Sequence, residues 1–86
     1  MLTRAIDIEI QGMVIEVGGS SGIVTIMGVV VSKLRKIQMA LTSSDYNIAC
    51  FADRKRLPVR CNGDLIKEGK NLLLQNPRNF RLDAAW

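Results

Sequence analysis

Two short runs of cations are the residues of this sequence best suited to a chemical role. They comprise Lys33, Arg35 and Lys36 and, further along the chain, Arg54, Lys55, Arg56 and Arg60. Lysine and arginine side chains neutralise phosphate groups, and such contacts give affinity for nucleic acid without reading its sequence. The pattern predicts a nucleic-acid interface of low sequence specificity, with single-stranded nucleic acid as the expected partner.

An aromatic side chain near these cations would add a surface on which a base could stack. Tyr46 shares an apolar stripe with Ile48 and Cys50, which favours core packing for its ring. Phe51 falls on the opposite face of the same segment and is the better candidate for an exposed ring. We therefore include Phe51 in the predicted nucleic-acid site.

The charge of the chain is unevenly distributed, which supports this interpretation. Twelve Lys and Arg residues against eight Asp and Glu residues give a net charge of +4. Residues 1–32 hold one cation and three carboxylates, so the excess of cations lies in residues 33–86. A basic half of this kind is typical of a protein that meets an anionic surface.

The residue inventory argues against an enzyme. The chain has no histidine, so neither a Ser-His-Asp nor a Cys-His arrangement can form within it. The segment GGSSG at 18–22 resembles a phosphate-binding loop in glycine content alone, because it lacks the Lys-Ser/Thr ending and a following helix. Two cysteines, Cys50 and Cys61, are too few for a zinc site. We expect no catalytic residue, no metal site and no cofactor.

Alternating apolar and polar residues predict strands in the first third of the chain. Residues 6–17 alternate with period two, and the apolar side changes after Gly12, which indicates a bend or bulge at this glycine. The segment 18–22 reads as a turn. The next segment, 23–31, is apolar almost throughout and rich in β-branched residues, which predicts a strand buried on both faces or paired on one face with another subunit.

The middle of the chain allows two interpretations. Apolar residues between 27 and 41 recur at spacings of three and four, which would suit a helix near residues 29–41. The same region also alternates with period two, as does 46–50, and the polar segment TSSD at 42–45 lies between them, as in a hairpin. We favour a hairpin of 35–42 with 46–52. Its two outer ends would bring both basic runs onto one rim.

The last third predicts one long irregular strand and its partner. Asn62-Gly63 indicates a bulge within this strand, Glu68-Gly69 a turn, and Pro77 the end of the strand that follows, from the usual positions of these residue types. The expected fold is mostly β, a small barrel of five or six short strands forming a single domain over 1–86. The alternative is an α+β fold with a helix near residues 29–41.

This order of elements resembles an OB-type barrel. In the resemblance, IEIQGMVIEV at 8–17 corresponds to the long bent first strand and LPVRCNGDL at 57–65 to a later one. OB barrels often carry a helix between their third and fourth strands, and the hairpin interpretation leaves only residues 52–57 for it. The sequence therefore predicts an OB-like barrel without that helix.

A second hypothesis for function is a self-associating structural or adaptor module that does not bind nucleic acid. The apolar segment 22–31 would bury one face against another copy, and Trp86 would dock on a neighbour. We accordingly expect a homo-oligomer, most simply a homodimer. The charged N-terminal segment does not resemble a signal peptide, and an apolar run of about ten residues is too short to span a bilayer. A cytoplasmic protein without a membrane partner is expected.

Overall fold

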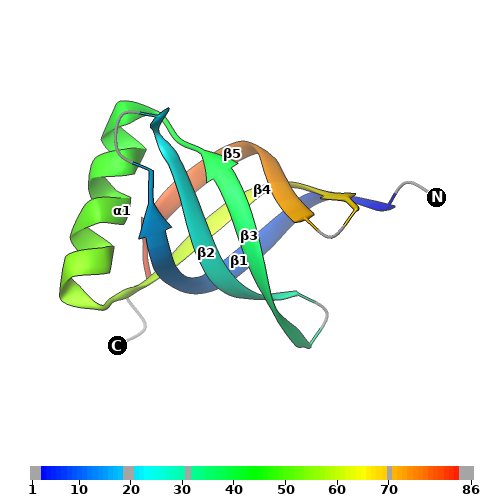
Figure 1. Ribbon diagram of the computed structural model, residues 1–86, viewed down its shortest axis with the longest axis horizontal. Coiled ribbons are helices and arrows are strands. Elements are labelled where there is room, and N and C mark those ends of the chain that lie inside the picture. Colours follow the sequence, from blue (N-terminus) through cyan, green and yellow to red (C-terminus); the bar gives the residue numbers. More distant parts are fainter. Residues whose placement is uncertain (1–2, 19–20, 31, 70, 84–86) are drawn as a thin grey trace.

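The computed structural model describes residues 3–18, 21–30, 32–69 and 71–83 and contains five strands and one helix (Figure 1). In chain order they are β1 (Thr3–Val17), β2 (Ile23–Val30), β3 (Lys33–Ala40), α1 (Ser43–Lys55), β4 (Pro58–Glu68) and β5 (Asn71–Leu82). The strands close into one barrel in the order β1-β2-β3-β5-β4. The predicted mostly β barrel is confirmed, with five strands.

The connectivity is that of an OB barrel. All neighbouring strands pair antiparallel except β3 and β5, which run parallel and are joined only where Ile37 meets Leu72 and Gln38 meets Leu73. Because this closure is short, the first residues of β3, 33–36, extend beyond the stretch that is paired with β5. These residues pair only with β2 on their other side.

The predicted hairpin of 35–42 with 46–52 is wrong, because residues 43–55 form α1. Thr42 caps this helix, its hydroxyl accepting a hydrogen bond from the backbone N–H of Asp45 at 3.3 Å. A polar cap of this type stabilises a helix start and resembles a turn in sequence. The helix buries only Ala49 and Ala52, whose small side chains let it approach the barrel closely. A helix is therefore present between β3 and β4, where the predicted hairpin excluded one.

The alternative helix near residues 29–41 is also wrong. β2 continues to Val30, and β3 starts at Lys33 with Ile37 and Met39 buried at period two. The spacing of three and four along this region arises from two strands in succession. The many β-branched residues of β2 fit a pleated sheet better than a helix.

The bulge or bend predicted at Gly12 is not a register shift at this residue, where the ladder with β2 is regular; Gly12 is instead a close approach of two backbones. A Cβ at Gly12 would lie 2.7 Å from the Cα of Gly28 on β2, and it would clash with the carbonyl oxygen of Met27. The register between β1 and β2 shifts just beyond, between Val14 and Glu16. Glycine is required here because β1 curves around the barrel against β2.

The predicted strand irregularity at Asn62-Gly63 is confirmed by register shifts on both sides of Asn62 in the β4–β5 ladder. The prediction that Pro77 ends its strand is wrong, since β5 continues to Leu82. A proline is tolerated in a strand beside such an irregularity, where no ladder hydrogen bond from its nitrogen is needed. Asn76 and Asn79 flank it, and both have positive φ values. Asparagine adopts this left-handed conformation more readily than most residues.

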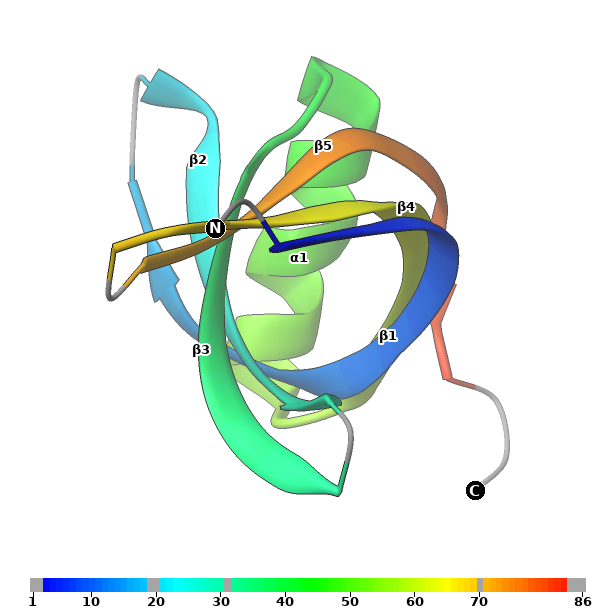
Figure 2. The same cartoon turned by 90° about the vertical axis from the view of Figure 1, so that its right-hand side faces the viewer.

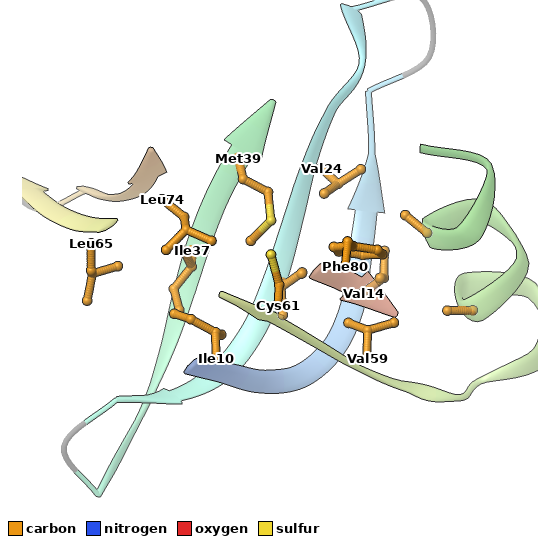
Figure 3. Close-up of a cluster of buried hydrophobic side chains, with 13 residues drawn as sticks. Ile10, Val14, Val24, Ile37, Met39, Val59, Cys61, Leu65, Leu74 and Phe80 are labelled. Carbon is orange, nitrogen blue, oxygen red and sulfur yellow. The ribbon is translucent and has the colours of Figure 1, made fainter. Parts of the chain in front are cut away.

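The core fills the barrel interior and is closed at one end by α1 (Figure 3). Its members from the strands are Ile10, Val14, Val24, Ile26, Ile37, Met39, Val59, Cys61, Leu65, Leu74 and Phe80. Figure 2 views the barrel from the end opposite α1, with the helix behind the ring of strands. Among the described residues, no helix covers this second end, which we call the open end. Trp86 lies outside the described residues.

Candidate anion site at the open end of the barrel

The structure separates the two predicted basic runs instead of bringing them together. Lys33, Arg35 and Lys36 lie at the start of β3, whereas the run 54–56 lies at the end of α1. Figure 1 shows these segments toward opposite ends of the long axis of the molecule. The single basic rim expected from the hairpin does not form, because α1 carries the chain away from β3.

The β3 cations, Lys33, Arg35 and Lys36, are all exposed. Side chains alternate across a strand, and Ile37 and Met39 point into the barrel. Lys33 and Arg35 therefore share the inner side and lie at its open end, while Lys36 lies on the outer surface beside Met27 of β2. The residues of β3 that precede the core thus carry positive charge on both faces.

The second basic run occupies the C-terminal end of α1. Arg54 and Lys55 lie in the last turn, and Arg56 caps the helix with a left-handed φ of 56°, its N–H donating to the carbonyl oxygen of Ala52. Cations at this end interact favourably with the helix dipole. This position gives the run a structural role that requires no ligand.

Phe51 is 39% exposed on α1 and does not accompany the β3 cations. Together with Ile48 it lines a shallow groove of about 430 Å³ against Arg81 and Leu82 of β5. The predicted combination of this ring with Lys33 and Arg35 is therefore absent from the structure.

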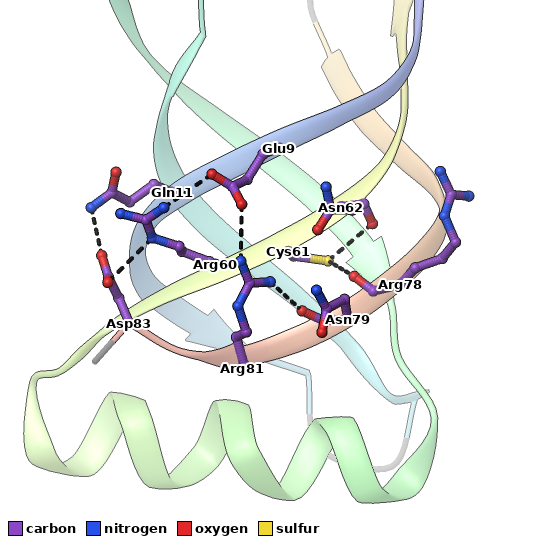
Figure 4. A network of polar contacts seen from close by, with 9 residues as sticks. All are labelled: Glu9, Gln11, Arg60, Cys61, Asn62, Arg78, Asn79, Arg81 and Asp83. Atoms are coloured by element: carbon purple, nitrogen blue, oxygen red, sulfur yellow. Dashed lines mark hydrogen bonds and ion pairs between the residues drawn. The ribbon is translucent and has the colours of Figure 1, made fainter. Parts of the chain in front are cut away.

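Arg60 is held by carboxylates of its own chain (Figure 4). Its guanidinium lies 3.1 Å from Glu9 and 3.2 Å from Asp83, whose side chain is only 5% exposed. Arg81 makes a further ion pair of 2.9 Å with Glu9. Arg60 thus serves as the counter-charge of a buried carboxylate, a structural role that the sequence did not indicate.

A second ionic group joins β1, β4 and β5. The carboxylate of Asp64 accepts hydrogen bonds from the backbone N–H of Asp7 at 2.9 Å and from the amide of Asn76 at 3.2 Å, and these donors lower the pKa of Asp64. Arg78 pairs with Asp7 at 2.8 Å, and this hydrogen bond raises the pKa of Arg78. The arginines on this side of the barrel are therefore matched by carboxylates.

A cavity of about 530 Å³ lies at the open end, and all five strands contribute to it. Its described lining consists of Ala5, Ile8, Glu9, Val29, Val30, Lys33, Arg35, Leu65, Lys67 and Leu72. Lys33, Arg35 and Lys67 provide positive charge, and Glu9, the one carboxylate in this described lining, is paired with Arg60 and Arg81. Such a site favours an anion that also carries an apolar part.

Lys67 is the residue that the sequence reasoning missed. It follows Leu65 by two positions on β4, so alternation alone places both on one side of the strand. Its proximity to Lys33 and Arg35 arises only when β4 and β3 are brought to the same end of a closed barrel. The sequence contains a signal for its orientation and none for its partners.

The described residues offer little for covalent or metal chemistry. Burial raises the pKa of the Cys61 thiol to about 11, which keeps it protonated and unreactive near neutral pH. No group of three His, Cys, Asp or Glu side chains comes together as a metal site within 3–18, 21–30, 32–69 and 71–83. In the same ranges no helix is long and apolar enough to cross a membrane.

Fold and site together define an OB-type barrel with a cationic, partly apolar open end. No family model matches this sequence, and no curated protein is significantly similar to it.

Proposed function

We propose that this protein binds single-stranded nucleic acid through phosphate contacts of low sequence specificity. The observation that carries the proposal is the group of exposed cations at the start of β3: Lys33 and Arg35 lie with Lys67 at the open end, and Lys36 lies next to them on the outer surface. OB barrels bind oligonucleotides over the face formed by their second and third strands and the loops between strands one and two and strands four and five. The β3 cations lie on this part of the barrel.

The low specificity follows from the composition of the same surface. β2 and β3 contain no aromatic residue, so they provide no ring on which a base could stack. Lysine and arginine contacts to phosphate position a strand without reading its bases. Electrostatic attraction therefore supplies the affinity, and binding should weaken steeply as salt increases.

A pair of matched triple variants tests the proposal. One variant neutralises β3 with Lys33→Gln, Arg35→Gln and Lys36→Gln. The other neutralises α1 with Arg54→Gln, Lys55→Gln and Arg56→Gln. Both remove three positive charges, so a difference between them reports location and not net charge.

Anisotropy of a labelled single-stranded oligonucleotide is measured over a range of salt concentrations. Each phosphate contact contributes about 0.7 to the slope of log K against log[salt] for a single strand. We expect the β3 triple to lower this slope by about 2 and the α1 triple to leave it nearly unchanged. Equal effects of both triples, or no binding by the wild-type protein at low salt, would reject the proposal.

Self-association is the second candidate function, and one observation favours it. Val29 and Leu34 lie opposite each other on β2 and β3 and are 54% and 66% exposed, so they form an apolar pair on the surface. The rest of the apolar segment contributes less than expected, because Val24 and Ile26 face the core of their own barrel. Light scattering of the wild-type protein and of a Val29→Ser, Leu34→Ser variant tests this candidate. A larger mass for the wild-type protein alone would support association through this pair.

A further inference from the structure

We propose that the cavity at the open end is a binding site for a small amphipathic anion, namely an aliphatic carboxylate whose chain enters the barrel. This site goes beyond the proposed contact with nucleic acid, since it lies inside the barrel end and includes residues that the β3 triple does not contain. The cavity has a volume of about 530 Å³. Sites that hold small molecules commonly have volumes of this size.

The walls of the cavity are aliphatic. Ile8, Val30, Leu65 and Leu72 come from four different strands and line it together with Ala5. Leu65 is 7% exposed, and the others are half-buried, so the apolar surface is recessed within the barrel end. A hydrocarbon chain placed here would shield this surface from water, which is the main driving force for binding apolar groups.

The mouth of the cavity is cationic. Lys33 and Arg35 of β3 and Lys67 of β4 line it, and the carboxylate of Glu9 is paired with Arg60 and Arg81. Positive charge therefore lies beside the apolar walls without a matching free carboxylate in the described lining. This arrangement complements a ligand with a negative head and an apolar tail.

The walls favour an aliphatic ligand over a nucleotide. A base carries several hydrogen-bonding groups that need partners once they leave water. Apart from the cations and Glu9, the described lining consists of Ala, Ile, Val and Leu side chains, and it contains no aromatic ring. A saturated chain makes no such demand, so the carboxylate of a medium-length fatty acid fits the lining best.

The first experiment titrates the wild-type protein with decanoate below its micelle concentration, followed by ¹H–¹⁵N NMR and calorimetry. We expect saturable binding of one decanoate and shifts centred on Ala5, Val30 and Leu72. Decanol, which lacks the charge, should bind about fivefold more weakly, as expected for loss of an exposed ion pair worth about 1 kcal/mol. Shifts scattered over the surface, or adenosine monophosphate binding where decanoate does not, would overturn the proposal.

Variants separate this site from the nucleic-acid site. Lys67→Gln removes one cation from the mouth and should weaken decanoate by about twofold to fivefold. Leu72→Gln makes one wall polar and should weaken decanoate by about fivefold or more, because apolar contact with the chain is lost. Lys36→Gln, on the outer surface, should leave decanoate binding unchanged while weakening oligonucleotide binding. If decanoate binds both cavity variants as tightly as it binds the wild-type protein, this inference is rejected and the nucleic-acid proposal is unaffected. If Leu72→Gln does not fold, Lys67→Gln and the wild-type NMR map still decide the question.

Discussion

Gly12 of β1 and Gly28 of β2 lie directly opposite each other in the barrel, so close that a Cβ at Gly12 would be 2.7 Å from the Cα of Gly28. The β1–β2 register runs unbroken through this pair and shifts between Val14 and Glu16. Gly28 also adjoins the first residues of β3, because it pairs with Arg35 on its other side. The two backbones can approach this closely because Gly12 has no side chain, and Arg35 of β3 lies directly beside Gly28.

Replacement of Gly12 by alanine should destabilise the protein. The added methyl group meets backbone atoms of β2, which cannot move as a side chain can. We therefore expect a loss of about 3 kcal/mol, at the upper end of overpacking costs. Urea unfolding measures this change. Ile15→Val, an exposed position on the same strand, is the control and should change stability by less than about 0.5 kcal/mol. Similar losses in both variants would contradict a steric role for Gly12.

Replacement of Arg60 by methionine should lower the stability of the protein and leave oligonucleotide binding unchanged. The variant keeps an apolar stem and removes the guanidinium that lies 3.2 Å from the buried carboxylate of Asp83. The expected cost is about 1–3 kcal/mol. Arg81→Met removes a more exposed partner of Glu9 and should cost no more than about 1 kcal/mol. Thermal unfolding and anisotropy on the same samples test both parts. Loss of oligonucleotide affinity in folded Arg60→Met would place Arg60 in the binding site.

The two cysteines should differ in reactivity. Cys61 is buried, and burial raises its pKa from 9.0 to about 11. At pH 8 its thiolate fraction is therefore about a hundredfold smaller than that of a thiol with the ordinary pKa. Cys50 is half-buried on α1. A thiol reagent should therefore modify Cys50 in the native protein and Cys61 only after unfolding, as read by mass spectrometry of peptides. Rapid native modification of Cys61 would contradict its burial.

The same thiol should make stability depend on alkaline pH. Its pKa in the folded protein, about 11, lies above the ordinary value of 9.0. Its contribution is therefore fully present below the unfolded pKa and is lost as pH rises through the folded one. The free energy of unfolding of the wild-type protein should thus decrease as pH rises from 9.0 to about 11. A Cys61→Ala variant, although less stable at neutral pH, should lack this part of the decline.

Asp64 should make stability depend on acid pH, and its stabilising contribution is lost as pH falls, whereas that of Cys61 is lost as pH rises. The hydrogen bonds from Asp7 and Asn76 lower its folded pKa from the ordinary value of 3.8. Its contribution is therefore present above the unfolded pKa and is lost as pH falls through the folded one. Asp64→Asn should show a smaller loss of stability on acidification than the wild-type protein. Equal losses of stability on acidification in Asp64→Asn and in the wild-type protein, measured by urea unfolding at several pH values, would contradict this role of Asp64.

Local alternation predicted the strands well and the helix badly. β1 and β4 were recognisable because a half-buried strand alternates at every second residue, and their glycines mark bends where a side chain would not fit. α1 was missed because it buries only two alanines, which give no apolar stripe, while Tyr46, Ile48 and Cys50 happen to alternate as in a strand. Its Thr42 cap reads equally well as a turn.

The sequence by itself determined which residues carry charge, that histidine chemistry is absent, and that alternating strands with glycine bends form a small barrel. Tertiary structure decided how those charges are grouped. Formation of α1 moved the run 54–56 away from β3, and two carboxylates distant in the sequence, Glu9 and Asp83, neutralised Arg60. Barrel closure brought Lys67 beside Lys33 and Arg35. The physical reason is that alternation fixes the side of a strand on which a residue lies, whereas its neighbours across the barrel depend on strand order and register.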